Sequence, residues 1–200
     1  MLSTDQAQSV SARIAQRVKR LPKGQPFDLS RFTEFGTKNA VSKAIARLVN
    51  RGELERVYRG IYMRPKSGRY VAKARPNPWK LLSLIARQKR LSLQIHGANA
   101  VRKFGLSTQM PLIPIYYTNG ASRSVFIGKA EIRLVHAVPM VMQHAGTEVG
   151  VAISALYYLG KGGSTPKCIT SIKKRLSPED LGKLLACKLP KWMRMALEAK

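Results

Sequence analysis

Residues 37–64 read TKNAVSKAIARLVNRGELERVYRGIYMR, and a helical periodicity gives way to a β-rich one within this segment. In the first half, apolar residues recur at the spacing of a helix that buries one face, namely Val41, Ala44, Ile45, Leu48 and Val49. Thr37 is a good N-cap and Gly52 is well placed to end the helix, so we predict a helix from residue 37 to about residue 51. In the second half, two short β-rich runs flank Tyr58-Arg59-Gly60, which predicts a hairpin over residues 53–64.

The other face of the predicted helix is polar and carries no acidic residue. Amide side chains such as Asn recognise adenine in the major groove of DNA, and Arg or Lys recognise guanine. The N-terminal turns of a recognition helix usually enter that groove, while a later Arg can reach a phosphate. We therefore predict that five residues of this helix contact DNA: Lys38, Asn39, Ser42, Lys43 and Arg47.

The predicted hairpin adds three arginines to this surface. Arg59 stands at the tip, from which an Arg can enter a narrow A·T-rich minor groove. Arg56 and Arg64 lie in the predicted strands, and we include them among the DNA-binding residues. Tyr58 and Tyr62 are expected to pack as ordinary strand aromatics.

The elements before residue 37 complete a recognisable order. Val10, Ile14, Val18 and Leu21 predict a first helix, Asp28 is a good N-cap for a short second helix, and a tight turn follows at Phe35-Gly36. Helix, short helix, tight turn, helix and hairpin is the order of a winged helix-turn-helix. Residues 1–65 are therefore predicted to form such a domain.

The remainder of the chain predicts an α+β protein with a second domain. Residues 66–78 are rich in Lys, Arg, Gly and Pro and indicate a basic linker. Residues 79–200 then predict a mixed α/β domain, with turns at 119–120 and 128–129. The expected strands are 111–117, 124–127 and 131–136, and the expected helices are 78–90, 97–104, 148–159, 165–175, 178–187 and one opening at Pro190.

The charge of the chain predicts a polyanionic partner. It carries 36 Lys and Arg against 10 Asp and Glu, a formal net charge of +26, while its 44% hydrophobic content is that of an ordinary globular protein. Residues 1–75 hold 17 basic and 5 acidic side chains, and residues 76–200 hold 19 and 5. Both halves are therefore candidates for contact with nucleic acid.

Several other classes of protein are disfavoured. No apolar run approaches the roughly 20 residues that span a bilayer, and no secretory signal is visible, so we expect a cytoplasmic protein without a membrane partner. Cys168 and Cys187 lack the spacing of a zinc site or a disulfide framework. The acids are scattered, and no D-x-D, H-E-x-x-H, P-loop or G-x-S-x-G motif occurs, so we expect no catalytic residue, no cofactor and no metal.

The segment 51–62, RGELERVYRGIY, resembles the winged helix of the AbiEi family of antitoxins from type IV toxin–antitoxin systems. The resemblance continues in GANA at 97–100, FGLSTQMP at 104–111, TNG at 118–120 and LPKW at 189–192. It implies a transcriptional repressor that binds double-stranded DNA at promoter repeats of its own operon. By position it gives the DNA-contact role to Lys38, Asn39, Ser42, Lys43, Arg47 and Arg59.

The resemblance also implies a protein partner, a nucleotidyltransferase toxin that is countered through the C-terminal domain without a stable complex. We expect a monomer in solution, or copies paired on DNA. The alternatives are an RNA-binding protein, for which the charge is equally natural, and a DNA-binding adaptor of a mobile element without a toxin partner. The small number of Phe and Trp residues weighs against a reader of single-stranded RNA.

Overall fold

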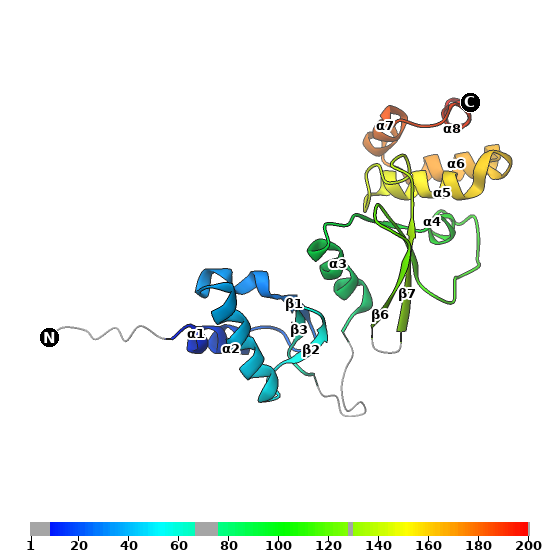
Figure 1. Cartoon of the computed structure of the whole chain (residues 1–200). Coiled ribbons are helices and arrows are strands. Elements are labelled where there is room, and N and C mark those ends of the chain that lie inside the picture. The colour runs from blue at the N-terminus through cyan, green and yellow to red at the C-terminus, as the bar shows by residue number, and fades with distance from the viewer. Residues whose placement is uncertain (1–8, 67–75, 128–129, 200) are drawn as a thin grey trace. The chain divides into compact units, whose positions relative to one another are not determined.

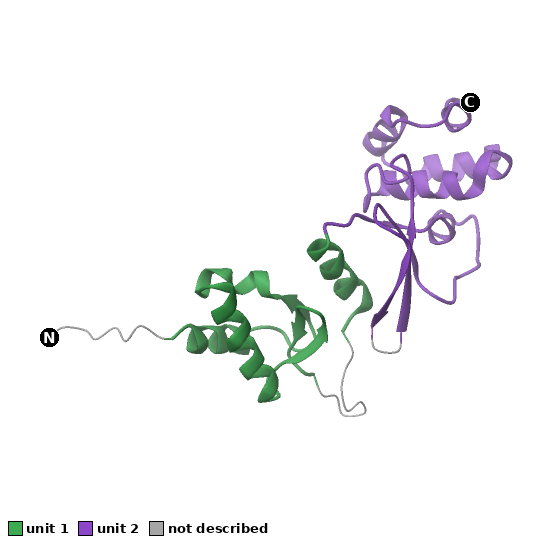
Figure 2. Cartoon of the chain, viewed as in Figure 1, with its two compact units in different colours: residues 1–89 green, residues 90–200 purple. Residues whose placement is uncertain are grey.

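The computed structural model describes residues 9–66, 76–127 and 130–199. The chain divides into two compact units, unit 1 of residues 1–89 and unit 2 of residues 90–200 (Figure 2). Each unit combines helices with a sheet, so the fold is mixed α+β, as predicted.

Unit 1 is built around a small antiparallel sheet with the strand order β1-β3-β2 (Figure 1). Its described elements are, in chain order, α1 (Val10–Lys19), β1 (Pro26–Asp28), the 3-10 helix η1 (Leu29–Phe35), α2 (Lys38–Asn50), β2 (Glu55–Tyr58), β3 (Ile61–Met63) and α3 (Pro78–Gln88). The helices α1 and α2 bury their apolar faces together with η1, and the resulting core contains Ile14, Val18, Phe27, Phe32, Ile45, Leu48 and Leu54.

Helix α2 forms as the sequence predicts. The hydroxyl of Thr37 caps it by accepting a hydrogen bond from the amide of Ala40 at 3.3 Å. Four residues of the predicted apolar face are buried, namely Val41, Ala44, Ile45 and Leu48, and the fifth, Val49, is partly buried. The helix ends at Asn50, and Gly52 follows with φ of +73°, a left-handed conformation that glycine adopts without steric cost. The predicted hairpin is also confirmed as β2 and β3.

Two features of unit 1 differ from the prediction. The segment after Asp28 is a 3-10 helix, although Asp28 caps it as expected by accepting from the amide of Ser30 at 3.1 Å. Strand β1 was not predicted at all. It is only three residues long and begins with a proline. These residues form a strand because they pair with β3, where Phe27 lies opposite Tyr62.

Helix α3 belongs to unit 1. The sequence predicts a linker over residues 66–78 and a second domain from residue 79 onward, whereas the structure groups α3 with the first unit. The reason is its apolar face, which packs on β1 and β3 and buries Leu81, Leu82, Ile85 and Ala86. Most of the predicted linker, residues 67–75, lies outside the described residues.

Unit 2 contains a mixed sheet with the strand order β4-β5-β7-β6, in which β5 and β7 run parallel and the other neighbours antiparallel. Its described elements are β4 (Leu93–Ile95), α4 (Gly97–Lys103), β5 (Ile115–Thr118), β6 (Arg123–Ile127), β7 (Ala130–His136), α5 (Glu148–Gly163), α6 (Pro166–Arg175), α7 (Pro178–Ala186) and α8 (Lys191–Glu198). All predicted helices are present, while the short β4 was not predicted. The predicted turn at 128–129 lies outside the described residues.

The core of unit 2 lies where α5 packs against α4 and β4. Residues 149–156 of α5 are buried without interruption, and Gly160, with φ of +65°, breaks the helical geometry close to the predicted end of the helix at residue 159. Helices α4 and α5 pack closely at Gly97, the first residue of α4, where an added Cβ would lie 2.2 Å from the Cβ of Tyr158 on α5.

Candidate nucleic-acid interface

The five residues predicted on α2 form one exposed surface. Lys38, Asn39, Ser42, Lys43 and Arg47 are all solvent-exposed, whereas the opposite side of the helix is buried. None of these five side chains forms a hydrogen bond or an ion pair with another residue of the described part of unit 1. The surface therefore presents amide, hydroxyl and cationic groups that are available to an external partner.

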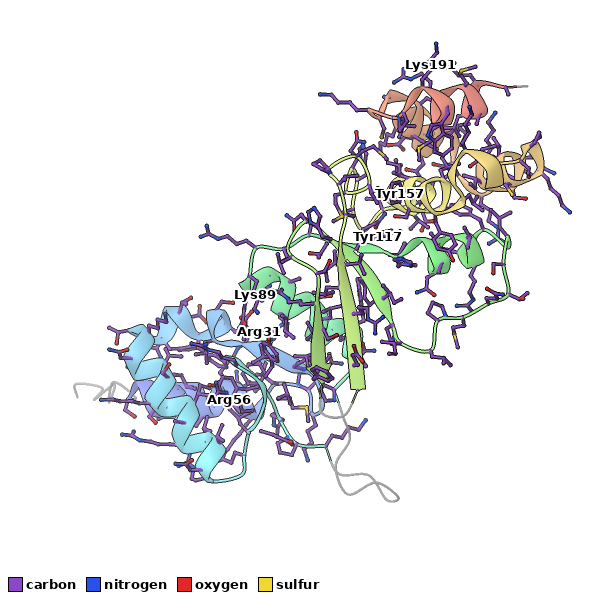
Figure 3. All side chains as sticks on the ribbon, turned by 45° about the vertical axis from the view of Figure 1, so that its right-hand side comes forward. Arg31, Arg56, Lys89, Tyr117, Tyr157 and Lys191 are labelled. Carbon is purple, nitrogen blue, oxygen red and sulfur yellow. The ribbon has the colours of Figure 1, made fainter. Side chains whose placement is uncertain are left out.

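The hairpin contributes one exposed arginine at its tip and one in a strand. Arg59 is exposed beside Gly60, whose φ of +74° allows the tight reversal between β2 and β3. Arg56, labelled in Figure 3, is exposed on β2 opposite Tyr62. Tyr62 packs against the core and lies 6.4 Å from Phe27 between ring centroids, so its expected structural role is confirmed.

Arg64 occupies a different position from the other predicted residues. Its guanidinium donates hydrogen bonds to the carbonyls of Lys19 at 2.6 Å and Leu21 at 2.7 Å. These carbonyls lie at the C-terminal end of α1, where backbone acceptors lack partners within the helix and a cation is favourable. Arg64, which directly follows β3, thus holds the end of the hairpin on α1, and the geometry gives it a structural role.

A groove connects α2 with the tip of the hairpin. It has a volume of about 570 Å³ and is lined by Asp28, Leu29, Ser30, Lys38, Gly60, Arg87 and Gln88. Four elements therefore meet at this hollow: the start of η1, the first turn of α2, the hairpin tip and the C-terminal end of α3. The groove brings the predicted residue Lys38 together with the tip that carries Arg59.

The floor of this groove contains a buried carboxylate with three donors. Asp28 accepts from the amide and the hydroxyl of Ser30 and, at 2.6 Å, from Nη2 of Arg87. The side chain of Asp28 is 6% exposed and that of Arg87 is 64% exposed. Burial by itself raises the pKa of this carboxyl, but the hydrogen bonds from Ser30 and Arg87 outweigh burial and hold its pKa below the usual value.

Sequence reasoning missed the contribution of α3 to this region. Gln88, the last residue of the helix, donates from Nε2 to the carbonyl of Gly60 at 3.2 Å. Arg87, the residue before it, is the partner of Asp28. Neither residue carries a sequence signal for these contacts, because their partners lie 28 and 59 positions away in the chain. The basic residues Arg31 and Lys89, next to the lining residues in sequence, are also exposed (Figure 3).

The charge of unit 1 as a whole is strongly positive. Residues 1–89 carry 20 Lys and Arg against 5 Asp and Glu. Two of the five acids are already neutralised in pairs, Asp28 with Arg87 and Glu53 with Arg51 at 2.9 Å. This excess of cations over acids in the sequence of unit 1 is of the kind that attracts polyanions.

Unit 2 contains a cluster of aromatic side chains around His96. The ring of His96 lies 4.5 Å from that of Tyr117, which lies 6.3 Å from that of Tyr157 (Figure 3). His96 also caps α4, because its Nδ1 accepts from the amide of Ala98 at 3.3 Å. Burial lowers the pKa of His96, so the imidazole is neutral near pH 7 and can serve as this acceptor.

In the ranges that the structure describes, no three His, Cys, Asp or Glu side chains are gathered as ligands of a metal ion. Within the same described ranges, no helix has the length and apolar character needed to cross a bilayer.

Residues 13–184 match the model of DUF6088, a family of unknown function, and the chain belongs to this family. No curated protein matches the chain. Among solved structures, the chain is distantly similar to the crystal structure of the Rv2827c protein from Mycobacterium tuberculosis. The two chains share 15% sequence identity with a TM-score of 0.44, over 96% of this chain and 77% of that chain.

Proposed function

We propose that this protein binds double-stranded DNA sequence-specifically and represses transcription, with unit 1 acting as a winged helix-turn-helix. Helix α2 would be the recognition helix and the β2–β3 hairpin the wing. The observation that carries the proposal is the division of α2 into two faces. Val41, Ala44, Ile45 and Leu48 are buried, while the exposed face presents the base-reading and phosphate-binding groups Lys38, Asn39, Ser42, Lys43 and Arg47.

The order of elements in unit 1 supports this assignment. Helix α1, strand β1, the short helix η1, helix α2 and the β2–β3 hairpin follow one another, and β1 joins the hairpin as a third antiparallel strand. A helix with a cationic and amide-bearing face fits the major groove of B-DNA, which is about 12 Å wide. Exposed Arg59 at the hairpin tip is suited to the adjacent minor groove.

The charge of the chain supplies the sequence-independent part of the affinity. Each phosphate neutralised by Lys or Arg releases condensed counterions, so the logarithm of the association constant falls with the logarithm of salt by roughly 0.9 for each contact. The excess of cations on unit 1 supports several such contacts. Unit 2, with 16 Lys and Arg against 5 Asp and Glu, is a second candidate for phosphate contact.

The resemblance to the AbiEi antitoxins supports a narrower proposal. The protein would repress its own operon by binding promoter repeats and would counter a nucleotidyltransferase toxin without forming a stable complex. Co-expression with the product of a neighbouring nucleotidyltransferase-like gene tests the second activity. Relief of toxicity in cells, without co-purification of the two proteins, is expected. Toxicity that is unchanged by the full-length chain would contradict it.

Fluorescence anisotropy with the full-length chain tests the DNA-binding proposal. The probes are a labelled duplex from the promoter of its own gene, a shuffled duplex of equal composition and a structured RNA of equal length. We expect tighter binding to the promoter duplex than to either competitor, and a steep loss of affinity between low and moderate salt. Equal affinity for both duplexes, salt-insensitive binding or preference for the RNA would overturn the proposal.

A further inference from the structure

Gln88 at the end of α3 contacts the tip of the hairpin directly. Its Nε2 donates to the carbonyl of Gly60 at 3.2 Å, and Gly60 follows the exposed Arg59. From this contact we infer that α3 is a working part of the DNA-binding surface and that Gln88 is a positioning residue, which orients the tip so that Arg59 enters an A·T-rich minor groove. This inference rests on the proposed function.

The approach of α3 to the tip is close as well as polar. A Cβ built on Gly60 would lie 3.2 Å from Nε2 of Gln88, and the φ of Gly60 is +74°. Two features therefore restrict the tip: the left-handed backbone conformation of Gly60 and the side-chain amide of Gln88 packed against it. The carbonyl that accepts the bond belongs to the residue after Arg59, so the contact restrains the Gly60–Ile61 peptide, one position beyond the residue that bears the guanidinium.

Helix α3 is itself a fixed support for this contact. The helix contacts β1 and β3 of the unit 1 sheet, and its residues Leu81, Leu82, Ile85 and Ala86 are buried. Polar contacts hold both ends of the helix: Lys80 donates to the side-chain oxygen of Gln25 at 2.8 Å, and Arg87 pairs with Asp28 at 2.6 Å. Gln88 therefore projects from a helix that is held on β1 and β3 of unit 1.

The contact contributes more to orientation than to stability. Gln88 is solvent-exposed, so water would satisfy its amide if the bond were absent. A single neutral hydrogen bond at the surface has little effect on global unfolding, whereas fixing a mobile tip before binding removes part of the entropy cost of association. The effect of Gln88 should therefore appear in DNA binding.

The groove beside the contact indicates which part of the duplex passes over it. Lys38 of α2, the tip bearing Arg59 and Arg87 of α3 surround a hollow of about 570 Å³. A duplex that places its major groove on α2 and its next minor groove on the tip brings the phosphodiester strand between the two grooves over this hollow. The partner is thus a duplex with an A·T-rich minor groove flanking the major-groove site, because narrow A·T tracts concentrate negative potential.

The test uses the full-length chain and two duplexes of equal length, one A·T-rich and one G·C-rich, in fluorescence anisotropy at fixed salt. The wild-type chain should prefer the A·T-rich duplex, and Arg59→Ala should abolish the preference. Gln88→Met, which keeps the length of the side chain but removes the donor, should weaken binding to the A·T-rich duplex by roughly five- to tenfold. The double variant should bind no more weakly than Arg59→Ala alone, because both substitutions remove the same contact.

Gln16→Met on the exposed side of α1 is the matched control and should leave both affinities unchanged. The thermal unfolding midpoint of Gln88→Met should stay close to that of the wild type, which separates positioning from a fold defect. An A·T preference retained by Gln88→Met, or losses that add in the double variant, would overturn the inference alone. A wild-type chain that binds neither duplex would overturn the proposed function and this inference with it.

Discussion

Nη2 of Arg87 on α3 lies 2.6 Å from Oδ2 of Asp28, which is the last residue of β1 and the N-cap of η1. The pair joins two segments that are 59 positions apart in the chain. It adds a polar contact to the apolar packing that holds α3 on the first unit. Because the Asp28 carboxylate is almost fully buried, its ionised form depends on the donors that surround it.

Replacing Asp28 by Asn should destabilise unit 1 and flatten its response to acid. Burial opposes ionisation of Asp28, but the donors Ser30 and Arg87 hold its pKa below the unfolded value. The stabilisation is therefore fully present above the unfolded pKa and is lost as the pH falls through the lower folded pKa. We expect Asp28→Asn to lose about 1–3 kcal/mol at pH 7 and to show a smaller decrease below about pH 4. Urea unfolding from pH 7 to pH 2 measures both effects.

The control for this experiment is Glu34→Gln, which changes an exposed carboxylate on η1. It should unfold like the wild type at each pH. A pH profile of Asp28→Asn that parallels the wild-type profile would contradict the assigned role of the Asp28–Arg87 pair.

Arg64 should matter for stability and not for recognition of DNA. Its guanidinium holds the carbonyls of Lys19 and Leu21, so Arg64→Ala leaves two acceptors at the end of α1 without this donor. We expect a loss of about 1.5–3 kcal/mol in unfolding free energy, the range for hydrogen bonds to a charged group. The folded variant should discriminate between promoter and shuffled duplexes as the wild type does. If the variant lost that discrimination while its stability stayed unchanged, Arg64 would have to be assigned to the DNA-contacting residues.

Substitutions on the exposed face of α2 should separate base contacts from phosphate contacts. Asn39→Ala and Lys43→Ala should each weaken the binding free energy for the promoter duplex by about 1–3 kcal/mol. The loss for the shuffled duplex should be much smaller, because base contacts depend on the sequence. Arg47→Ala should weaken binding to both duplexes about equally. It should also reduce the salt dependence of the association constant by the amount of roughly one phosphate contact. Anisotropy titrations over a salt series measure these quantities. Full promoter preference in both Asn39→Ala and Lys43→Ala would show that the reading face is wrongly assigned.

The parts of unit 1 that could be predicted are those determined over short sequence distances. The cap at Thr37, the apolar spacing of α2 and the reversal at Gly60 each depend on neighbouring residues. Strand β1 could not be predicted, because its three residues become a strand only by pairing with β3. The roles of Arg64 and Gln88 also depend on distant backbone carbonyls, so both residues look in sequence like ordinary exposed side chains.

A glycine in the core of unit 2 gives a sharp test of its packing. A Cβ on Gly150 of α5 would lie 2.4 Å from the carbonyl oxygen of His144 and 2.4 Å from Nε2 of Gln94. The side-chain oxygen of buried Gln94 also accepts from the amide of Gly146 at 2.9 Å. A shift of Gln94 away from the new Cβ would therefore disturb this hydrogen bond. We expect Gly150→Ala to lose about 1–3 kcal/mol of unfolding free energy through overpacking.

Gly182→Ala on α7 is the matched control. Its Cβ would meet no atom within 4 Å, and alanine should raise the unfolding free energy by about 0.5–1 kcal/mol. Urea unfolding followed by circular dichroism compares the two variants, and equal stability of both would contradict the packing described for α5 and β4.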